Sequence, residues 1–313
     1  MLHFKHILCV IGHQFHLNSA AFRRARSLAK GQQAQLTLLQ VLPDVAPLND
    51  EDSGHLRQQA CDRRRQDIQQ QLSTLDGAAD IDVQVGVGKR YVYTIQTVLQ
   101  QGFDLVIKVA ESPSWIDRWL GSDDMHLLRK CPCPVWLMRP DDKDDYHQIV
   151  AAVDLSTSDD SEVQLNDDIV QLASSVCLSD FASLDVVSVY DAPEAGFVSL
   201  WAEEPDKVQQ RMLEQELLQH EIAMKALLQR LSEHLGDDAY DYLQPVPRLR
   251  QGVASQQLIE EAHATKADLL VMGTVARSGI PGVIIGNTAE TVLSEVHCSV
   301  LAIKPAGFVS PVS

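Results

Sequence analysis

Apolar residues along this chain of 313 residues alternate between short continuous runs and longer stretches with helical spacing. Continuous runs such as Leu269 to Met272 are typical of strands that are buried on both faces of a parallel sheet. The stretches between them repeat apolar residues every three or four positions, which indicates amphipathic helices. In the first half this pattern predicts strands at about 5–12, 35–42, 81–87, 104–110 and 134–139, and helices at about 18–30, 54–75, 91–101 and 122–130.

The second half repeats the same alternation. The pattern predicts strands near 148–154, 184–190, 244–250, 268–273 and 299–304, and helices near 161–178, 205–235, 255–265 and 287–296. Strands that alternate with helices favour a parallel sheet with helices on both faces. Right-handed crossovers then leave a crevice at the carboxyl ends of the strands, where ligand-binding groups are expected to gather.

The two halves also align residue by residue. The run that contains Asp104 matches the run that contains Asp268, and the segment that ends at Pro140 matches the segment that ends at Pro305. Residues 140–146 between the two copies are rich in charge and have no apolar periodicity, which is typical of a linker. The sequence therefore predicts two α/β domains, residues 1–143 and 144–313.

Composition narrows the classes of partner. The formal net charge is −17, which argues against nucleic acid or an anionic membrane surface as the main partner. A phosphate ligand is still compatible with this charge, because helix N-termini supply local positive potential. No apolar run of about 20 residues is present, so no membrane span is expected. The six cysteines are scattered along the chain, and we expect a reduced, cytoplasmic setting.

Candidate binding residues follow two predicted strands of the second half. Asp154 ends the first strand, where its carboxylate could accept hydrogen bonds from a ribose hydroxyl or a base amino group; the alternative is an Asx turn or a helix cap. Gly273 ends the fourth strand, where a glycine would let the backbone approach a phosphate. Residues 286–290 predict a helix start with an Asn287–Glu290 capping box, and the amides of such a start can also hold phosphate oxygens.

The spacing of this loop carries a resemblance. Gly273 is followed by two residues, Ala276, nine residues, Gly286 and Asn287. This is similar to the Gly-x2-Gly-x9-Gly-(Ser/Thr) loop of universal stress proteins that bind ATP, which also carry an aspartate at the end of the first strand. Ala276 replaces the second glycine, and Asn287 replaces the hydroxyl residue, with the Thr288 hydroxyl one place later.

Both halves share the resemblance, so the chain resembles a tandem universal stress protein. That likeness implies that each half is Rossmann-like, with an open five-stranded sheet of order 3-2-1-4-5. It also implies that the second half binds ATP, with Mg²⁺. The likeness further implies pairing of the two halves like the family dimer and a regulatory stress protein without efficient catalysis, while association of two chains into a homodimer is left open by the sequence. The site residues that it implies are Ala152, Asp154, Val189, Met272, Gly273, Ala276, Arg277, Gly286, Asn287 and Thr288.

The first half departs further from the family pattern. Gly12 stands where the second half has its strand-end aspartate, and Val109 stands where it has the strand-end glycine. Glu111 adds negative charge, and Asp123 and Asp124 follow the remaining Gly-Ser pair. We therefore expect that the first half does not bind ATP in the family manner.

Two other functions are compatible with the sequence. The first-half crevice is expected to be apolar and could hold a small-molecule or lipid-like ligand, with Trp115 and Trp119 as its wall; the alternative is that both tryptophans pack against the protein. A nucleotide-hydrolysing enzyme would need a metal carboxylate and an activated water. Only Asp154 is a candidate for such a carboxylate, and the sequence shows no other catalytic or metal-binding constellation.

Overall fold

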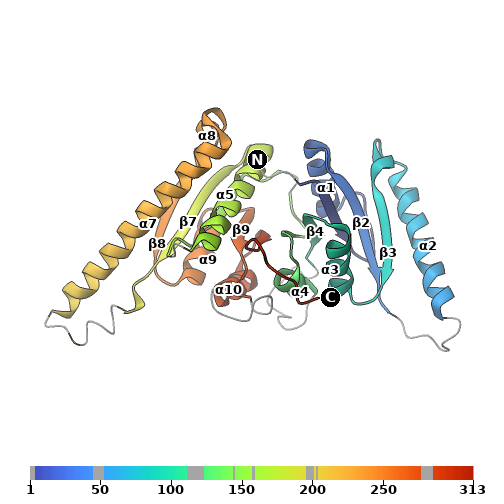
Figure 1. Cartoon of the computed structure of the whole chain (residues 1–313). Coiled ribbons are helices and arrows are strands. Elements are labelled where there is room, and N and C mark those ends of the chain that lie inside the picture. The colour runs from blue at the N-terminus through green and yellow to red at the C-terminus, as the bar shows by residue number, and fades with distance from the viewer. Residues whose placement is uncertain are drawn as a thin grey trace. The chain divides into compact units, whose positions relative to one another are not determined.

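The computed structural model shows a chain folded into two α/β units (Figure 1). It describes residues 4–44, 53–110, 123–143, 145–156, 159–194, 201, 204–275 and 285–312. One compact unit contains the described residues of the range 4–143, and the other contains those of 145–275 and 286–307. Each unit is described by itself below.

The first unit is built on a five-stranded parallel sheet. Strand β1 lies between β2 and β4, β3 pairs with the outer side of β2, and β5 pairs with β4. The order is thus 3-2-1-4-5, and every pairing is parallel. The strands are β1 (His6–Ile11), β2 (Gln35–Leu42), β3 (Asp82–Val87), β4 (Leu105–Val109) and β5 (Val135–Met138).

Helices join consecutive strands of this sheet. Helix α1 packs on β1, α2 packs on β3, and α3 packs against α4. The helices are α1 (Ala20–Gln32), α2 (Ser53–Leu72), α3 (Arg90–Gln101) and α4 (Asp123–Lys130), with a short 3₁₀ turn, η1, at Ala78–Asp80. The strands and helices of this half lie within a few residues of the predicted positions.

The second unit repeats the topology. Strand β6 lies between β7 and β9, β8 pairs with β7, and β10 pairs with β9, again in parallel. All five residues of β10 are buried, as a continuous apolar run predicts. The strands are β6 (Gln148–Ala152), β7 (Ser183–Tyr190), β8 (Val246–Gln251), β9 (Leu269–Gly273) and β10 (Ser299–Ile303). The predicted fold class is confirmed.

The helices of the second unit include one that the sequence pattern did not predict. Helix α8 (Asp237–Leu243) follows α7 (Pro205–Leu235) after a single residue, Gly236, whose φ is 81°. Two aspartates in its first turn favour the helix electrostatically. The other helices are α5 (Asp160–Asp180), α9 (Ala254–Ala264) and α10 (Asn287–Glu295). Among the helices that the structure describes, none is both long and apolar enough to cross a membrane.

The outermost strand of this unit, β8, carries two arginines that neutralise buried carboxylates. Arg248 Nε lies 3.0 Å from Asp185 Oδ2 and 3.2 Å from Glu261 Oε1. Arg250 Nε lies 2.6 Å from the other oxygen of Glu261. These pairs join β8 to β7 and α9, while charged side chains on an outer strand also disfavour pairing with another chain.

Candidate functional site

Asp154 lies just beyond the carboxyl end of β6, the central strand of the second sheet. Ala152, the last residue of β6, is buried and pairs in register with Val187 on β7 and Met272 on β9. Asn166 of helix α5 forms hydrogen bonds with both backbone polar groups of Asp154. The Asp154 N–H donates to Asn166 Oδ1 at 3.0 Å, and Asn166 Nδ2 donates to the Asp154 carbonyl oxygen at 2.7 Å.

The carboxylate of Asp154 forms an Asx turn. The backbone N–H and the hydroxyl of Ser156 both donate to Asp154 Oδ1, at 3.2 and 2.9 Å. The helix-cap alternative is wrong, because Asp159 caps α5 and accepts a 3.0 Å hydrogen bond from the Ser161 N–H. The turn holds the Asp154 carboxylate in one orientation at the strand end.

Gly273 lies where α5 packs against β9. A Cβ built on it would lie 3.0 Å from Leu165 Cδ2 and 3.9 Å from Ile169 Cδ1. The missing side chain thus lets α5 pack closely on β9. The same helix holds Asp154 in place through Asn166. Gly273 is not among the positive-φ residues of the described chain, so its backbone conformation does not require a glycine.

The start of α10 is tied to the end of β9. The Gly286 N–H donates to the Thr274 carbonyl oxygen at 3.1 Å, and the Thr274 N–H donates to the Ile303 carbonyl oxygen at 3.3 Å. Lys304 Nζ donates to Thr274 Oγ1, and both side chains are buried. The sequence pattern did not predict this pair, and its only signal was the lysine directly after the last strand.

The N-terminus of α10 is not capped by a side chain. Gly286 is the N-cap residue, with extended φ of −64° and ψ of 142°, so the predicted capping box of Asn287 and Glu290 is wrong. Asn287 and Thr288 are exposed. Helix starts of this kind present backbone amides that lack intrahelical partners and favour an anion.

The structure therefore brings most of the expected residues to one edge of the second sheet. Ala152, Asp154, Met272, Gly273 and residues 286–288 lie at the carboxyl ends of the neighbouring strands β6 and β9. Val189 lies near the end of β7, in register with Arg250, and is half-buried. Ala276 and Arg277 lie outside the described residues.

The same edge of the first sheet holds a buried ion pair. Lys108 Nζ contacts Asp124 Oδ1, and their side chains are 4% and 8% exposed. Burial lowers the pKa of Lys108 from its usual value, and Asp124 opposes that shift without cancelling it. Asp124 is one of the two acidic residues that follow the Gly-Ser pair, and Lys108 neutralises its charge.

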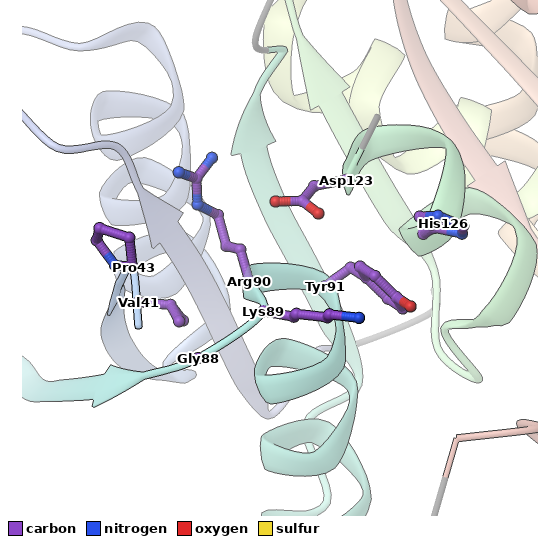
Figure 2. Close-up of a pocket in the computed structure, with 8 residues that line it drawn as sticks. All are labelled: Val41, Pro43, Gly88, Lys89, Arg90, Tyr91, Asp123 and His126. Atoms are coloured by element: carbon purple, nitrogen blue, oxygen red, sulfur yellow. The ribbon is translucent and has the colours of Figure 1, made fainter. Parts of the chain in front are cut away.

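Two cavities open at the carboxyl edge of the first sheet. One, of about 400 Å³, lies between the ends of β2 and β3 and the starts of α3 and α4 (Figure 2). The other, of about 240 Å³, lies beside the ends of β1 and β4. Both are lined by Arg90; polar and charged side chains make up most of the lining of the larger cavity, whereas the smaller one is lined mainly by apolar residues. Trp115 and Trp119 lie outside the described residues.

Cysteine, histidine, aspartate and glutamate side chains are spread over the described part of the chain. No group of three or more His, Cys, Asp or Glu side chains is placed there to hold a metal ion. The six cysteines are buried thiols, and none of them forms a disulfide bond. Burial raises the pKa of Cys9 to about 12, which makes it a poor nucleophile at neutral pH.

Comparison with known proteins gives consistent results for both halves. The model of the universal stress protein family matches residues 3–139 and 145–304. The chain is 29% identical to universal stress protein E of Photorhabdus laumondii, covering 85% of this chain and 82% of that protein. It is 25% identical to the universal stress protein E homolog of Haemophilus influenzae, covering 97% and 98%.

Solved structures agree. A functionally unknown protein from Pseudomonas aeruginosa PAO1 has 25% identity and a TM-score of 0.65, over 96% of this chain and 93% of that one. A putative universal stress protein from Pseudomonas aeruginosa UCBPP-PA14 has 24% identity and a TM-score of 0.66, over 96% and 94%.

Proposed function

The chain belongs to the universal stress protein family, and on that premise we propose that its second half binds ATP, with Mg²⁺, at the ends of β6 and β9. The bound nucleotide serves a regulatory role in the stress response. Asp154 receives the ribose or the base, and residues 286–288 receive the phosphates. The Ala152 and Val189 positions border the base, and Met272, Gly273, Ala276 and Arg277 belong to the same site.

One observation carries this proposal. A fixed carboxylate and an uncapped helix start lie at the ends of two adjacent parallel strands, and the Gly286–Thr274 hydrogen bond ties the helix start to its strand. A carboxylate accepts hydrogen bonds from hydroxyl and amino groups, while helix-start amides donate to phosphate. A nucleoside phosphate presents both kinds of group.

The first half supports the assignment by contrast. Lys108 and Asp124 occupy positions that correspond to Met272 and Ala289, and the two side chains contact each other in the protein interior. Gly12 corresponds to Asp154, and its carbonyl oxygen accepts a hydrogen bond from the buried amide of Gln40. The first half thus lacks the carboxylate that we assign to the nucleoside.

Calorimetric titration of the whole chain with ATP and Mg²⁺ tests the proposal. We expect saturable binding that Asp154→Ala abolishes and that Thr288→Val weakens roughly ten- to a hundredfold, since a hydrogen bond to a charged group contributes about 1.5–3 kcal/mol. Asp241→Ala is the matched control, because it removes an exposed carboxylate of α8. Undetectable binding at millimolar ATP would refute the proposal, as would equal affinity in the Asp154 and Asp241 variants.

We propose that ATP hydrolysis at this site is slow at best. Asp154 is the carboxylate that we place there, and its Oδ1 already accepts two hydrogen bonds from Ser156. Efficient hydrolysis requires an oriented water and a group that takes its proton. Phosphate release measured over hours on the wild-type chain tests this, and rapid turnover that depends on Asp154 would contradict it.

A further inference from the structure

Two cysteine side chains of the first half lie in contact at the junction between α4 and β5. Cys131 Sγ lies 3.6 Å from Cys133 Sγ, within hydrogen-bonding distance for sulfur. Both side chains are buried, since Cys131 is fully covered and Cys133 is 8% exposed. The junction is at the amino end of β5, and neither cysteine lines the two cavities at the carboxyl edge of the sheet.

The second half supplies a direct comparison for this junction. Cys133 corresponds to Cys298 there, whereas Cys131 corresponds to Val296. The backbone is the same in both halves, because the N–H of Cys131 and the N–H of Val296 each donate at 2.9 Å to the carbonyl oxygen four residues earlier. Val296 is 2% exposed, so an apolar side chain satisfies the packing at this position. Packing therefore does not explain the second thiol of the first half.

Prolines restrict the backbone on both sides of Cys133. Pro132 and Pro134 flank it, whereas the second half has a histidine and a serine at these positions. A proline ring fixes its own φ and restricts the residue before it, so Pro132 limits Cys131 and Pro134 limits Cys133. A backbone with few accessible conformations holds the two sulfurs together before a ligand arrives, which lowers the entropic cost of binding.

Two sulfur atoms in contact suit a soft cation that accepts two ligands. Thiolate sulfur favours Cu(I) over hard cations such as Mg²⁺ and Ca²⁺. Zn²⁺ in structural sites takes four ligands, and within the ranges that the structure describes no three His, Cys, Asp or Glu side chains are grouped to hold a metal ion. The donor set therefore favours a two-coordinate soft cation over zinc.

The exchange of a proton for such a cation suits a buried site. A thiol proton lies in the hydrogen bond between the two sulfurs, and a monovalent cation that replaces it leaves the charge of the pair unchanged. A change in net charge would be costly here, because both side chains are more than nine-tenths buried. The displaced proton goes to solvent, and neither sulfur is oxidised or reduced, so binding consumes no other reactant.

Oxidation of the pair to a disulfide is the alternative chemistry. The hydrogen bond with Cys131 raises the pKa of Cys133, and burial raises it further. The thiolate, and not the thiol, is the form that attacks an oxidant, so the pair resists oxidation at neutral pH. A soft cation does not require a thiolate beforehand, because it releases the proton as it binds.

We propose that Cys131 and Cys133 form a binding site for one soft monovalent cation, Cu(I) by its chemistry, which both sulfurs coordinate. The cation enters past Cys133, because its side chain is the partly exposed one of the two. The site does not depend on the nucleotide site proposed for the second half, since both sulfurs belong to the first unit.

Competition with a coloured chelator tests the site. The reduced whole chain is titrated with the bicinchoninate complex of Cu(I), under nitrogen and with ascorbate to keep the copper monovalent. We expect one Cu(I) per chain to pass from the chelator to the protein, and X-ray absorption at the copper edge to show two sulfur neighbours. A chain that takes up no copper, or copper that is coordinated by nitrogen, would overturn the proposal.

Variants identify the two sulfurs. Cys131→Val copies the residue of the second half and should lower the Cu(I) affinity about a hundredfold or more, because a lost ligand costs more than a lost outer partner. Cys133→Ser should do the same, since a hydroxyl oxygen is a hard ligand. Cys298→Ala is the matched control, because it removes the corresponding thiol of the second half, and it should change the affinity less than about twofold.

Three further results would contradict the proposal. They are an unchanged affinity in a folded Cys131→Val chain, equal weakening by Cys298→Ala, and binding of Zn²⁺, followed with an indicator dye, that is as tight as that of Cu(I). Circular dichroism checks that each variant is folded; if Cys131→Val is not, Cys133→Ser decides, and if neither is, the sulfur neighbours in the wild type decide. Asp154→Ala should leave Cu(I) binding unchanged even if it abolishes ATP binding.

Discussion

The buried pair of Lys108 and Asp124 makes a sharp prediction, because the second half of the same chain supplies its replacement. The corresponding residues there are Met272 and Ala289, and both are buried in the same kind of strand and helix. We predict that Lys108→Met alone destabilises the first half strongly. Lys108→Met combined with Asp124→Ala should restore stability to near the wild-type level.

The magnitude follows from burial. Both side chains are more than nine-tenths buried, so removing Lys108 leaves an unpaired buried carboxylate, which costs about 3–5 kcal/mol. Removing both charges ends the cost of desolvating them, and such replacements are often neutral or stabilising by about 1–4 kcal/mol. The lowered pKa of Lys108 has burial as its largest cause, with the attraction of Asp124 second. The attraction thus does not offset desolvation, which favours the neutral or stabilised outcome.

The pH dependence has a defined sign. Because the pKa of Lys108 is lower in the folded chain than its usual value of 10.5, the unfolded chain binds more protons between the two values. The stability contributed at this site therefore rises as pH increases from the folded pKa toward 10.5. The double variant lacks the lysine, so this rise should disappear in it.

Hydrogen exchange measured by mass spectrometry is the appropriate assay, because a chain with two domains need not unfold in one transition. Peptides that cover β1 and β4 report the opening free energy of the first half, and peptides from β6 and β9 serve as an internal reference. If Lys108→Met opens the first half by less than about 1 kcal/mol, the buried-charge argument fails. It also fails if the double variant is as unstable as the single one.

Three further outcomes are expected. Gly86→Ala places a Cβ 2.1 Å from Tyr93 Cζ, so urea unfolding should show that the free energy of unfolding falls by about 1–3 kcal/mol. Adding Tyr93→Ala should restore part of this loss. An unchanged unfolding midpoint in Gly86→Ala would contradict the clash. Arg248→Met should lower the free energy of unfolding by about 2 kcal/mol in the same assay, because buried Glu261 loses a partner. The loss is smaller than for a fully buried pair because Arg248 is partly exposed. Cys9, with a pKa of about 12, should resist iodoacetamide at pH 8 until the chain unfolds, as peptide mass spectrometry would show.

The strands and helices were predictable wherever burial alone decides them. Strands such as β4 and β9 are covered on both faces, so their sequences are continuous apolar runs bounded by polar residues. Helix α8 was not predicted because it is short and only Gly236 separates it from the long α7. The two helices therefore do not share one periodic apolar pattern. The glycine between them marks the break only when its positive φ is known.

The location of the expected residues at the strand ends was predictable, but their local packing was not. Gly273 marked the right strand end, yet its missing side chain faces Leu165 and Ile169 of α5. Asn287 is a good cap by type, but the backbone turns one residue earlier and Gly286 occupies the cap position. Side-chain direction and backbone angles depend on the packed neighbours, and sequence spacing does not specify them.

The first half keeps part of the backbone frame of the second half, although it has lost the loop motif. The first half lacks the strand-end aspartate, and its equivalent of Met272 is a lysine held by a buried carboxylate. The glycine turns at Gly88 and Gly252 are nevertheless the same in both halves. One backbone turn is therefore kept in both halves, although the residues that follow it differ in charge. Aligning the residues after the two glycines would have revealed Lys89 and Arg90 from the sequence, because the difference in charge is visible only when the copies are compared at that turn.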